Sequence, residues 1–250
     1  MIEFKGVTKT FGSRKVLDNV SYTVERGEVF VIVGFSGAGK SVSLKHMIRL
    51  LTPDEGQVLI DGEPINEATG SDLSRIREKF GLLFQGGALL EWLSVAENVA
   101  LPLREKTLMS EEEIMSAVRE KLTLVGLENS SALYPADISG GMRKRVALAR
   151  AIVTQPEIIL YDEPTSGLDP VTSRNIDKLI TDMQKELKVT SVVVTHDLFS
   201  ALAIGTRIAM IYEGNFIELS EPEKFIKSEN QAVKNFLDAQ YITQDGPWNR

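Results

Sequence analysis

Residues 34–41 are the segment with the clearest chemical signature. They read GFSGAGKS and follow the pattern G-x-x-x-x-G-K-[ST], with the apolar run EVFVIV directly before them. Three glycines permit a tight loop whose backbone N–H groups point inward, and the helix that follows adds the positive end of its dipole. We expect Lys40 to reach the β- and γ-phosphates of a nucleotide, and the Ser41 hydroxyl suits Mg²⁺. A glycine-rich turn without a ligand is the weaker alternative, because both flanking elements fit the motif.

An acidic pair ends another strongly apolar segment. In EIILYDEP, Asp162 closes the run and Glu163 follows at once. A carboxylate at a strand end beside the phosphate loop can hold Mg²⁺ through water. Glu163 could orient or deprotonate an attacking water molecule. Alone, such a pair is more often a solvated strand end; together with the phosphate loop, the catalytic interpretation is favoured.

The two histidines receive different interpretations. His196 ends the apolar segment SVVVTH, where a histidine is more often a hydrogen-bonded structural residue than a catalyst. Ligands of open α/β sheets bind at the carboxyl edge, however, and this position lies at that edge. We therefore include His196 among the candidate catalytic residues. His46 has no special spacing and is interpreted as structural.

The segment ISGGMRKRVALARA is not explained by one bound nucleotide. Ser139, Gly140 and Gly141 begin a strongly helical run, so they form a second helix N-terminus with bare backbone donors, which suits phosphate. Simple N-capping by Ser139, worth about 1 kcal/mol, is the alternative. The basic residues 143–145 would then be a solvated face. Capping alone does not need two glycines, which let another surface approach closely.

The elements that must position these groups alternate between strands and helices. This alternation predicts a largely parallel sheet covered on both faces. We expect strands at residues 2–7, 20–24, 28–34, 157–162 and 191–196. We also expect a hairpin turned by Asp61 and Gly62, and helices at 40–51 and 170–187.

Helical periodicity dominates residues 85–155, so a helical block is inserted into the α/β core. Within it, Ile114, Val118, Leu122 and Val125 form one apolar stripe, typical of an amphipathic helix. One or two further amphipathic helices are expected near the C-terminus. Two hypotheses concern the apolar residues of that segment: they pack on a partner subunit, or the chain end is frayed. They are Phe236, Leu237, Tyr241 and Trp248.

Composition sets the general class of the protein. Of 250 residues, 43% are hydrophobic and 25% charged, which is ordinary for a globular protein. The absence of cysteine excludes a cysteine zinc site, and two histidines make a histidine metal cluster improbable. A net charge of −7 argues against nucleic acid as a partner. Without a run of 18 apolar residues or an apolar signal core, we expect no transmembrane helix and no secretion signal, so that any membrane role acts through a partner.

Taken in order, the motifs resemble those of the ATP-binding subunit of ABC transporters, over residues 3–220. Residues 34–41 look like Walker A, Asp162 like the Walker B aspartate, Glu163 like the catalytic base, and His196 like the switch histidine that contacts the γ-phosphate. Gln85 resembles the Q-loop glutamine that senses Mg²⁺ and the membrane partner.

Further matches complete the set. Residues 139–142 resemble the signature, here ISGGM for the common LSGGQ, and the SGLD that ends at Asp169 resembles the D-loop. Phe11 matches the aromatic that stacks on adenine. The resemblance implies ATP contacts at Phe11, Gly34, Phe35, Ser36, Gly37, Ala38, Gly39, Lys40, Ser41, Val42 and Gln85, Mg²⁺ ligation by Ser41, Gln85 and Asp162, catalysis by Lys40, Glu163 and His196, and signature contacts from Ser139, Gly140, Gly141 and Met142.

The resemblance also implies a fold and an assembly. The fold is α/β, with a P-loop NTPase (RecA-like) core, an antiparallel β subdomain and an inserted α-helical subdomain. The assembly is a head-to-tail homodimer that sandwiches two ATP molecules, each between the phosphate loop of one copy and the signature helix of the other. Asp169 has a second interpretation as an N-cap before Pro170. The implied segments are residues 1–86 (β subdomain and first part of the core), 87–154 (helical subdomain with the signature), 155–220 (second part of the core) and 221–250 (C-terminal helical tail).

Within the family, three segments resemble the ATPase of bacterial lipid-asymmetry (Mla-type) phospholipid transporters. They are residues 39–63, 84–105 and 138–152. Residues 86–90, 102–105 and Met142 are typical of that subgroup, and Val42 replaces the usual Thr or Ser. Met142 stands where the common signature has glutamine, so an amide that could contact nucleotide is missing. The backbone N–H groups of Gly140 and Gly141 would remain as donors. The subgroup implies a peripheral location at the cytoplasmic face of the bacterial inner membrane. Its partners would be a membrane permease, an MCE-domain protein and, optionally, a small regulatory subunit, without direct cargo contact.

The expected function is therefore ATP hydrolysis that drives a permease for phospholipid, whose coupling helix would sit near residues 85–104. An ordinary loop and helix is the structural alternative for that segment. An ABC ATPase for another substrate, such as an amino acid, a metal or a drug, is the main functional alternative. A soluble, non-transport ABC ATPase is disfavoured, because it needs a second ATPase half or a coiled-coil insert. A nucleotide kinase would leave the helix end at Ser139 unexplained.

Overall fold

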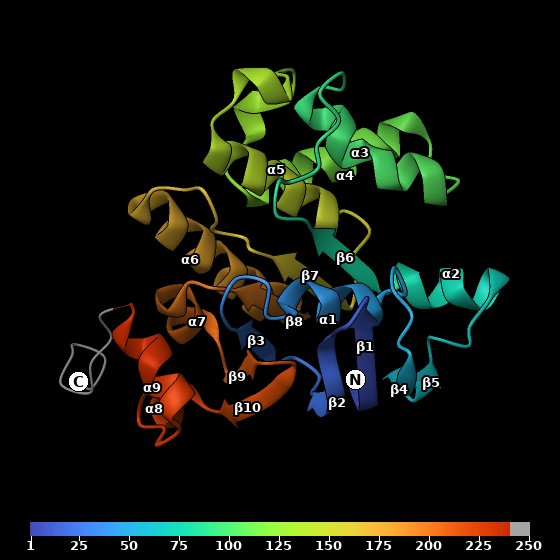
Figure 1. The fold of residues 1–250 in the computed structure, drawn as a ribbon. Coiled ribbons are helices and arrows are strands. Elements are labelled where there is room, and N and C mark those ends of the chain that lie inside the picture. The colour runs from blue at the N-terminus through green and yellow to red at the C-terminus, as the bar shows by residue number, and fades with distance from the viewer. Residues whose placement is uncertain (241–250) are drawn as a thin grey trace. The chain divides into compact units, whose positions relative to one another are not determined.

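The structure, a computed structural model, describes residues 1–240 (Figure 1). The chain forms two compact units: the first comprises Met1–Arg77 and Thr190–Arg250, and the second comprises Glu78–Val189. Both contain strands and helices, which confirms the expected α/β class. The division into four sequence segments stays a prediction. Within residues 1–240, no helix is both long enough and apolar enough to cross a membrane.

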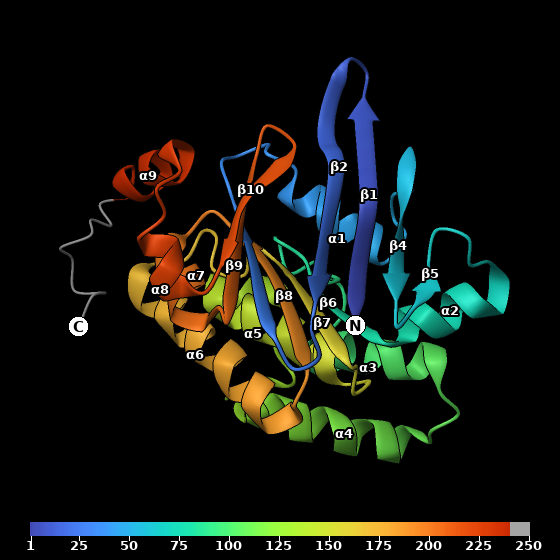
Figure 2. The ribbon, with the colours of Figure 1, turned by 90° about the horizontal axis from the view of Figure 1, so that it is seen from below.

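The first unit contains an antiparallel sheet of order β2-β1-β4-β5 (Figure 2). Its strands are β1 (Ile2–Phe11), β2 (Arg14–Val24), β4 (Glu55–Ile60) and β5 (Glu63–Pro64). The expected turn between β4 and β5 is confirmed, since Asp61 and Gly62 both have positive φ, at 51° and 81°. Such a pair of left-handed residues matches the twist of a tight hairpin.

A second set of strands in the first unit has the order β10-β9-β3-β8. It consists of β3 (Val29–Val33), β8 (Thr190–Thr195), β9 (Arg207–Tyr212) and β10 (Asn215–Ser220). Strand β3 runs parallel to both β8 and β9, and all five of its residues are buried. A strand that is apolar throughout needs cover on both faces, as its sequence indicates.

The helices of the first unit are short. They are α1 (Lys40–Met47), α2 (Gly70–Glu78, which ends at the boundary), α7 (Leu198–Ile204), α8 (Pro222–Ile226) and α9 (Gln231–Asp238). Helix α1 ends four residues earlier than expected, because Arg49 takes a left-handed φ of 54° and the Lys45 carbonyl accepts the N–H groups of Leu50 and Leu51.

The second unit pairs two parallel strands with a group of helices. The elements are β6 (Phe80–Leu83), β7 (Ile158–Asp162), α3 (Val95–Lys106), α4 (Glu111–Leu124), α5 (Gly140–Ile152), α6 (Pro170–Leu187) and the 3₁₀ turns Glu128–Ser130 and Pro135–Asp137. Ser94 and Ser110 begin α3 and α4 with complete capping boxes. The predicted apolar stripe of α4 is confirmed, since Ile114, Val118 and Leu122 are buried in the core of this unit.

The C-terminal helices belong to the first unit, where α8 lies beside the β9–β10 hairpin (Figures 1 and 2). Phe236 and Leu237 are only 3% and 4% exposed. The hypothesis that these two residues pack on a partner subunit is therefore wrong, because their side chains are already buried within the chain. Tyr241 and Trp248, the other members of that set, lie outside the described residues.

Candidate functional site

The phosphate loop joins β3 to α1, and two of its glycines have no room for a side chain. A Cβ at Gly34 would lie 2.5 Å from the carbonyl oxygen of Ile211, and one at Gly39 would lie 2.8 Å from that of Val16. Gly39 is also the N-cap of α1, with a left-handed φ of 109°. Glycine at these two positions therefore lets the loop pack closely against the backbone of β9 and β2.

Lys40 is buried at the start of α1. Its Nζ donates hydrogen bonds to the carbonyl oxygens of Gly34, at 2.8 Å, and Phe35, at 3.2 Å. Arg14 donates to the carbonyl of Gly37 at 2.9 Å, so a second cation lies at the loop. Ser41 follows on the first turn of α1 and is half-buried, as is Val42. Two cations and a helix N-terminus together make this loop suited to a polyphosphate.

The structure brings His196 to the edge of the phosphate loop. Val33 at the end of β3 pairs in register with Thr195 at the end of β8. Gly34 and His196 follow these two residues directly, so they leave the same carboxyl edge of the sheet. His196 is exposed, as are Phe35 and Ser36. The catalytic role of His196 stays a prediction.

Two aromatic residues of the first unit differ in their surroundings. Phe11 ends β1 and is 46% exposed, with Lys9 Nζ lying 5.7 Å from the centre of its ring. Its remaining exposed surface is what stacking on a base needs. Phe35 in the phosphate loop instead contacts Phe236 edge-on, with ring centres 5.0 Å apart.

His46 is 1% exposed, and its Nδ1 lies 2.7 Å from the carbonyl oxygen of Val42. Burial lowers its pKa, and the charge of Lys9 adds to that effect. A neutral imidazole that donates to its own helix is a structural residue, as its sequence position suggests.

In the second unit, Gln85 and Glu163 leave the same edge of a parallel strand pair. Leu83 at the end of β6 pairs with Tyr161 in β7, and each candidate lies two residues further on. Asp162 ends β7 and is half-buried. Glu163 is buried, with a left-handed φ of 49°. This backbone is anchored at its carbonyl oxygen, which accepts from the hydroxyl of Ser166 at 3.0 Å.

Lys144 is the residue that the sequence interpretation missed. Although the basic run 143–145 reads as a solvated face, Lys144 is 5% exposed. Its Nζ donates to the backbone carbonyls of Gln85 and Glu163, the latter at 3.0 Å. Burial lowers the pKa of Lys144, opposed by the charges of Glu163 and Asp162. The signal was the helical phase, because Lys144 lies three and seven residues before Ala147 and Ala151, both buried.

Arg150, six positions after Lys144 on α5, also donates to backbone carbonyls. Its guanidinium donates to the carbonyls of Gly87, at 2.5 Å, and Ala88, at 2.7 Å. Gly87 and Ala88 have φ values of 78° and 46°. Helix α5 therefore holds the whole segment 85–88 through its backbone, so the position of Gln85 depends on α5.

The signature segment combines capping with close packing. Ser139 is the N-cap of α5, and its Oγ accepts from Met142 N–H at 3.3 Å. A Cβ at Gly141 would lie 2.5 Å from Cγ2 of Thr172 on α6, whereas one at Gly140 would make only ordinary contacts. The surface that approaches Gly141 thus belongs to the same chain. Met142 packs against the helical core, so its side chain is engaged there.

Asp169 caps α6, which confirms its interpretation as an N-cap. Its Oδ1 accepts from the N–H groups of Val171 and Thr172, both at 3.0 Å. The Thr172 hydroxyl and these backbone donors lower the pKa of Asp169. A D-loop role, which concerns a partner copy, stays a prediction.

The residues expected to hold Mg²⁺ offer the right chemistry. Among residues 1–240, no group of three or more His, Asp or Glu side chains could hold a metal. Ser41, Gln85 and Asp162 provide hydroxyl, amide and carboxylate oxygens, and Mg²⁺ bound with a nucleotide takes few protein ligands beside phosphate oxygens and water. The donor chemistry of each of these residues therefore suits Mg²⁺.

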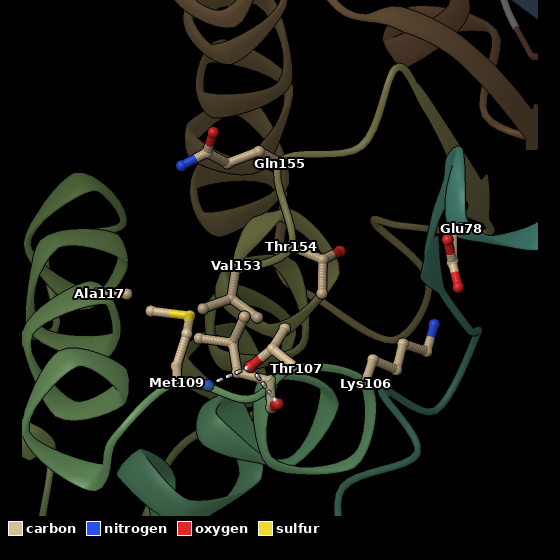
Figure 3. Close-up of a pocket in the computed structure, with 9 residues that line it drawn as sticks. Glu78, Lys106, Thr107, Met109, Ala117, Val153, Thr154 and Gln155 are labelled. Carbon is tan, nitrogen blue, oxygen red and sulfur yellow. Dashed lines mark hydrogen bonds between the residues drawn. The ribbon is translucent and has the colours of Figure 1, made fainter. Parts of the chain in front are cut away.

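Two adjoining hollows lie in the second unit. One, of about 330 Å³, is lined by Phe84, Leu90, Leu101 and Pro102 among others. The other, of about 340 Å³, shares Lys106 and Thr154 with it. Figure 3 shows Lys106 and Glu78 on one side of this second pocket and Ala117 of α4 on the other. We call the first hollow the α3 groove.

Comparison with known proteins identifies the family. The family model described as ABC transporter matches residues 17–166, more than half of the chain. The chain belongs to the ABC transporter family. It resembles the dimeric ABC transporter cassette MJ0796 with a TM-score of 0.82 and 38% identity, over 89% of this chain and 99% of that one. The ABC ATPase fold, with its P-loop core, is thereby confirmed.

Curated ABC relatives cover nearly the whole chain. The probable ribonucleotide transport ATP-binding protein mkl of Mycobacterium tuberculosis is 43% identical over 96% of this chain and 67% of its own length. The intermembrane phospholipid transport system ATP-binding protein MlaF of Escherichia coli K12 is 38% identical over 99% and 91%. The methionine import ATP-binding protein MetN of Clostridium tetani is 39% identical over 95% and 80%.

This ABC cassette is an ATPase that binds ATP and hydrolyses it to ADP and phosphate in support of transport. A further structure of MJ0796, 37% identical to this chain, is dimeric and holds ADP and phosphate. ATP-binding cassettes of the family dimerise and pair with membrane permeases.

Proposed function

We propose that this ABC ATPase is the energy-coupling subunit of a phospholipid transporter at the cytoplasmic face of the bacterial inner membrane. The similarity to MlaF over nearly the full length of both chains supports this cargo. The partners would be a permease, an MCE-domain protein and an optional small regulatory subunit. Phospholipid itself would not touch the chain, because the permease carries it.

The site residues have distinct proposed roles in hydrolysis. The backbone of the phosphate loop and Lys40 bind the β- and γ-phosphates, and Phe11 stacks on the adenine. Ser41, Gln85 and Asp162 would hold Mg²⁺, which supplies positive charge to the phosphates. Glu163 accepts the proton of the attacking water, and His196 donates a hydrogen bond to the γ-phosphate.

The signature helix is proposed to act on the nucleotide of a second copy. Ser139 and Gly140 are exposed at the N-terminus of a thirteen-residue helix. Such an end attracts phosphate. A head-to-tail dimer would use it, together with the D-loop at Asp169, and would open again after hydrolysis.

One observation carries the proposal of a permease partner of the phospholipid subgroup. The residues that resemble this subgroup, 86–90 and 102–105, include three that line the α3 groove: Ala88, Leu90 and Pro102. Cargo class is a property of the permease, so the residues that differ between subgroups belong where the permease docks. Exposed Phe84 adds apolar surface there, and an apolar groove of this kind suits a helix of the permease.

The relatives favour a second candidate cargo class. MetN, named for methionine import, is as similar in identity as MlaF. An importer ATPase for an amino acid would share the same groove and the same nucleotide chemistry. The two candidates therefore differ only in the permease and its cargo.

Purification from native membranes tests this proposal. The tagged chain would be extracted in mild detergent, and its co-purifying proteins and organic-soluble lipids identified by mass spectrometry. We expect a multi-span permease and an MCE-domain protein, with phospholipid in the complex. An amino-acid-binding protein in place of the MCE-domain protein would support the second candidate and contradict the first.

A variant in the groove tests the docking site. Leu90→Glu places a charge in the α3 groove and should reduce the yield of co-purified permease at least about tenfold, because a buried charge is costly in an apolar interface. Leu108→Glu is the matched control, since Leu108 is fully exposed in the same unit and does not line the groove. Equal permease yields from the two variants would contradict the assignment of the groove.

A further inference from the structure

The α9 segment, residues 231–240, belongs to the first unit and contacts two of its loops. Each of these loops carries a candidate catalytic residue of the unit. One contact is to the phosphate loop, and the other is to the loop after His196. The two contacts come from Phe236 and Gln240, which lie four positions apart. No residue of this segment belongs to the motifs that define the ATPase.

The first contact anchors α9 on the phosphate loop. The ring of Phe236 is 3% exposed and meets the ring of Phe35 edge-on, at 5.0 Å between centres and an angle of 74°. Phe35 also meets Tyr212 of β9 in the same manner, at 6.2 Å. Edge-to-face aromatic pairs define an orientation as well as a distance. The end of α9 therefore has a defined position relative to the loop.

The second contact is a two-point hydrogen bond to the backbone around His196. Gln240 Nε2 donates to the carbonyl oxygen of His196 at 2.7 Å, and Gln240 Oε1 accepts from Leu198 N–H at 2.9 Å. One amide thus binds the peptide groups on both sides of Asp197. This pairing uses the donor and the acceptor of the glutamine side chain together.

Neighbouring bonds hold the rest of this loop. Asp197 N–H donates to Oγ1 of Thr195 at 3.0 Å, and the Asp197 carboxylate caps α7 by accepting from Ser200 N–H at 3.1 Å. The bonds from Gln240 span 44 and 42 positions in sequence. They tie the His196 backbone to a part of the chain that also contacts the phosphate loop.

We propose that Gln240 is a positioning residue for ATP hydrolysis, which sets the backbone at His196 relative to the phosphate loop. This inference rests on the proposed role of His196 at the γ-phosphate. A hydrogen bond from a side chain weakens steeply when its angle or distance changes. Loss of the Gln240 amide would therefore reduce hydrolysis while leaving the phosphate loop able to bind ATP.

A simpler role for Gln240 is to cap α7. Leu198 is the first residue of α7, and the first N–H groups of a helix need partners outside it. In that case only the bond from Leu198 would matter, and its loss would lower stability rather than turnover. The two roles differ in which half of the amide is required.

Two substitutions separate these roles. Gln240→Met keeps the length of the side chain and removes both hydrogen bonds, whereas Gln240→Glu keeps the acceptor for Leu198 and places a negative oxygen at the His196 carbonyl. We expect each to lower kcat about tenfold, because both remove the hydrogen bond to the His196 carbonyl, with the KM for ATP and the melting temperature nearly unchanged. Asp238→Ala, on the exposed face of the same helix, is the matched control and should leave kcat unchanged.

A double-mutant cycle then shows whether Gln240 acts through His196. Single-turnover hydrolysis would be measured for His196→Ala, Gln240→Met and the double variant. The fraction of each protein that binds nucleotide would be determined first, so that rates refer to binding-competent protein. We expect Gln240→Met to have no further effect once His196 is absent, because residues that act as a unit are not additive.

Each other result has a definite meaning. Wild-type kcat in Gln240→Glu would show that only the cap on α7 matters and would overturn the inference. Additive effects in the cycle would do the same, and so would a fall in melting temperature that accounts for the lost activity. Normal hydrolysis by His196→Ala would instead remove the proposed role of His196, a failure distinguishable from the others because it involves no change at Gln240.

Discussion

Single residues in this cassette are held through their backbones. Glu163 has a left-handed φ of 49°, a conformation that costs a non-glycine residue about 1 kcal/mol or more. Its carbonyl oxygen is bound by Ser166 and by the buried Lys144. These two bonds fix the backbone from which the Glu163 carboxylate projects. Lys144 binds the carbonyl of Gln85 in the same way.

Removal of the Lys40 ammonium should abolish function at the phosphate loop. Lys40→Ala deletes the ammonium group that binds the carbonyls of Gly34 and Phe35. The same group is the proposed positive charge for the β- and γ-phosphates. We expect ATP turnover to fall about 100-fold or more, as is usual when one preorganised donor is removed. Lys45→Ala, exposed on the same helix, is the control. Unchanged turnover in Lys40→Ala would contradict the site assignment.

His46 should make the protein less stable in mild acid. Burial lowers its folded-state pKa below the ordinary 6.5, so the unfolded state binds the proton more tightly. Stability is therefore complete above pH 6.5 and is lost as the pH falls from there through the lower, folded-state pKa. Melting temperatures between pH 8 and pH 5 check this.

The comparison for this pH series is His46→Asn. Its amide can replace the Nδ1 donor to the Val42 carbonyl, but it does not titrate. We expect a shallower decline of melting temperature with falling pH in this variant than in the wild type. Parallel declines in the two proteins would show that His46 does not contribute.

At the scale of elements, helix α5 connects the motifs of the second unit. Its first turn forms the signature, Lys144 and Arg150 bind residues 85–88, and Gly141 packs against α6. A shift of α5 would therefore move the Q-loop and the backbone of Glu163 together. Movement of the signature end of α5 would therefore reach the backbone of Glu163, the candidate general base.

The packing of α5 on α6 gives a sharp test with a matched pair. Gly141→Ala puts a methyl group 2.5 Å from Cγ2 of Thr172, so it should lower the free energy of unfolding by about 1–3 kcal/mol. Gly140→Ala, where the nearest atom is 3.4 Å away, should change it by less than about 0.5 kcal/mol. Urea denaturation measures both.

Relief of the clash provides the control for that pair. Thr172→Ser removes the offending methyl group and keeps the hydroxyl near Asp169. The double variant with Gly141→Ala should regain most of the lost stability. Failure to recover would mean that the cost at Gly141 arises from its backbone and not from Thr172.

At the scale of the whole molecule, the proposed head-to-tail dimer joins the phosphate loop of one copy to the signature helix of the other. Glu163→Gln should keep ATP binding but slow hydrolysis by about 10²–10⁴-fold, because it removes the proposed general base. With MgATP this variant should run as a dimer in gel filtration. The control is Glu157→Gln, the same substitution at the residue that directly precedes β7.

A second substitution tests the geometry of that dimer. In the Glu163→Gln background, Gly140→Asp puts a negative charge where the phosphates of the second copy are expected, and should return the protein to monomer. Ala136→Asp adds the same charge at another exposed position of the unit and should leave the dimer intact. Monomer in every case would contradict the head-to-tail assembly.

Local sequence determined the phosphate loop, the caps at Ser139 and Asp169, and the order of strands and helices. These features depend on residues within a few positions of one another, on glycine conformations, and on the 2- and 3.6-residue periodicities. The loop glycines and the edge position of His196 could be predicted for this reason. So could the buried strand β3 and the apolar stripe of α4.

Only the tertiary structure decided the contacts between distant segments. Lys144 reads as a surface residue beside Arg143 and Arg145, yet it binds carbonyls 59 and 19 positions away. Gln240 lies in a polar terminal segment, yet it binds the backbone at His196. Side chains that bind backbone carbonyls need no particular partner residue, so no motif marks them. Their partners are selected by how the chain folds back on itself, which spacing along the sequence does not encode.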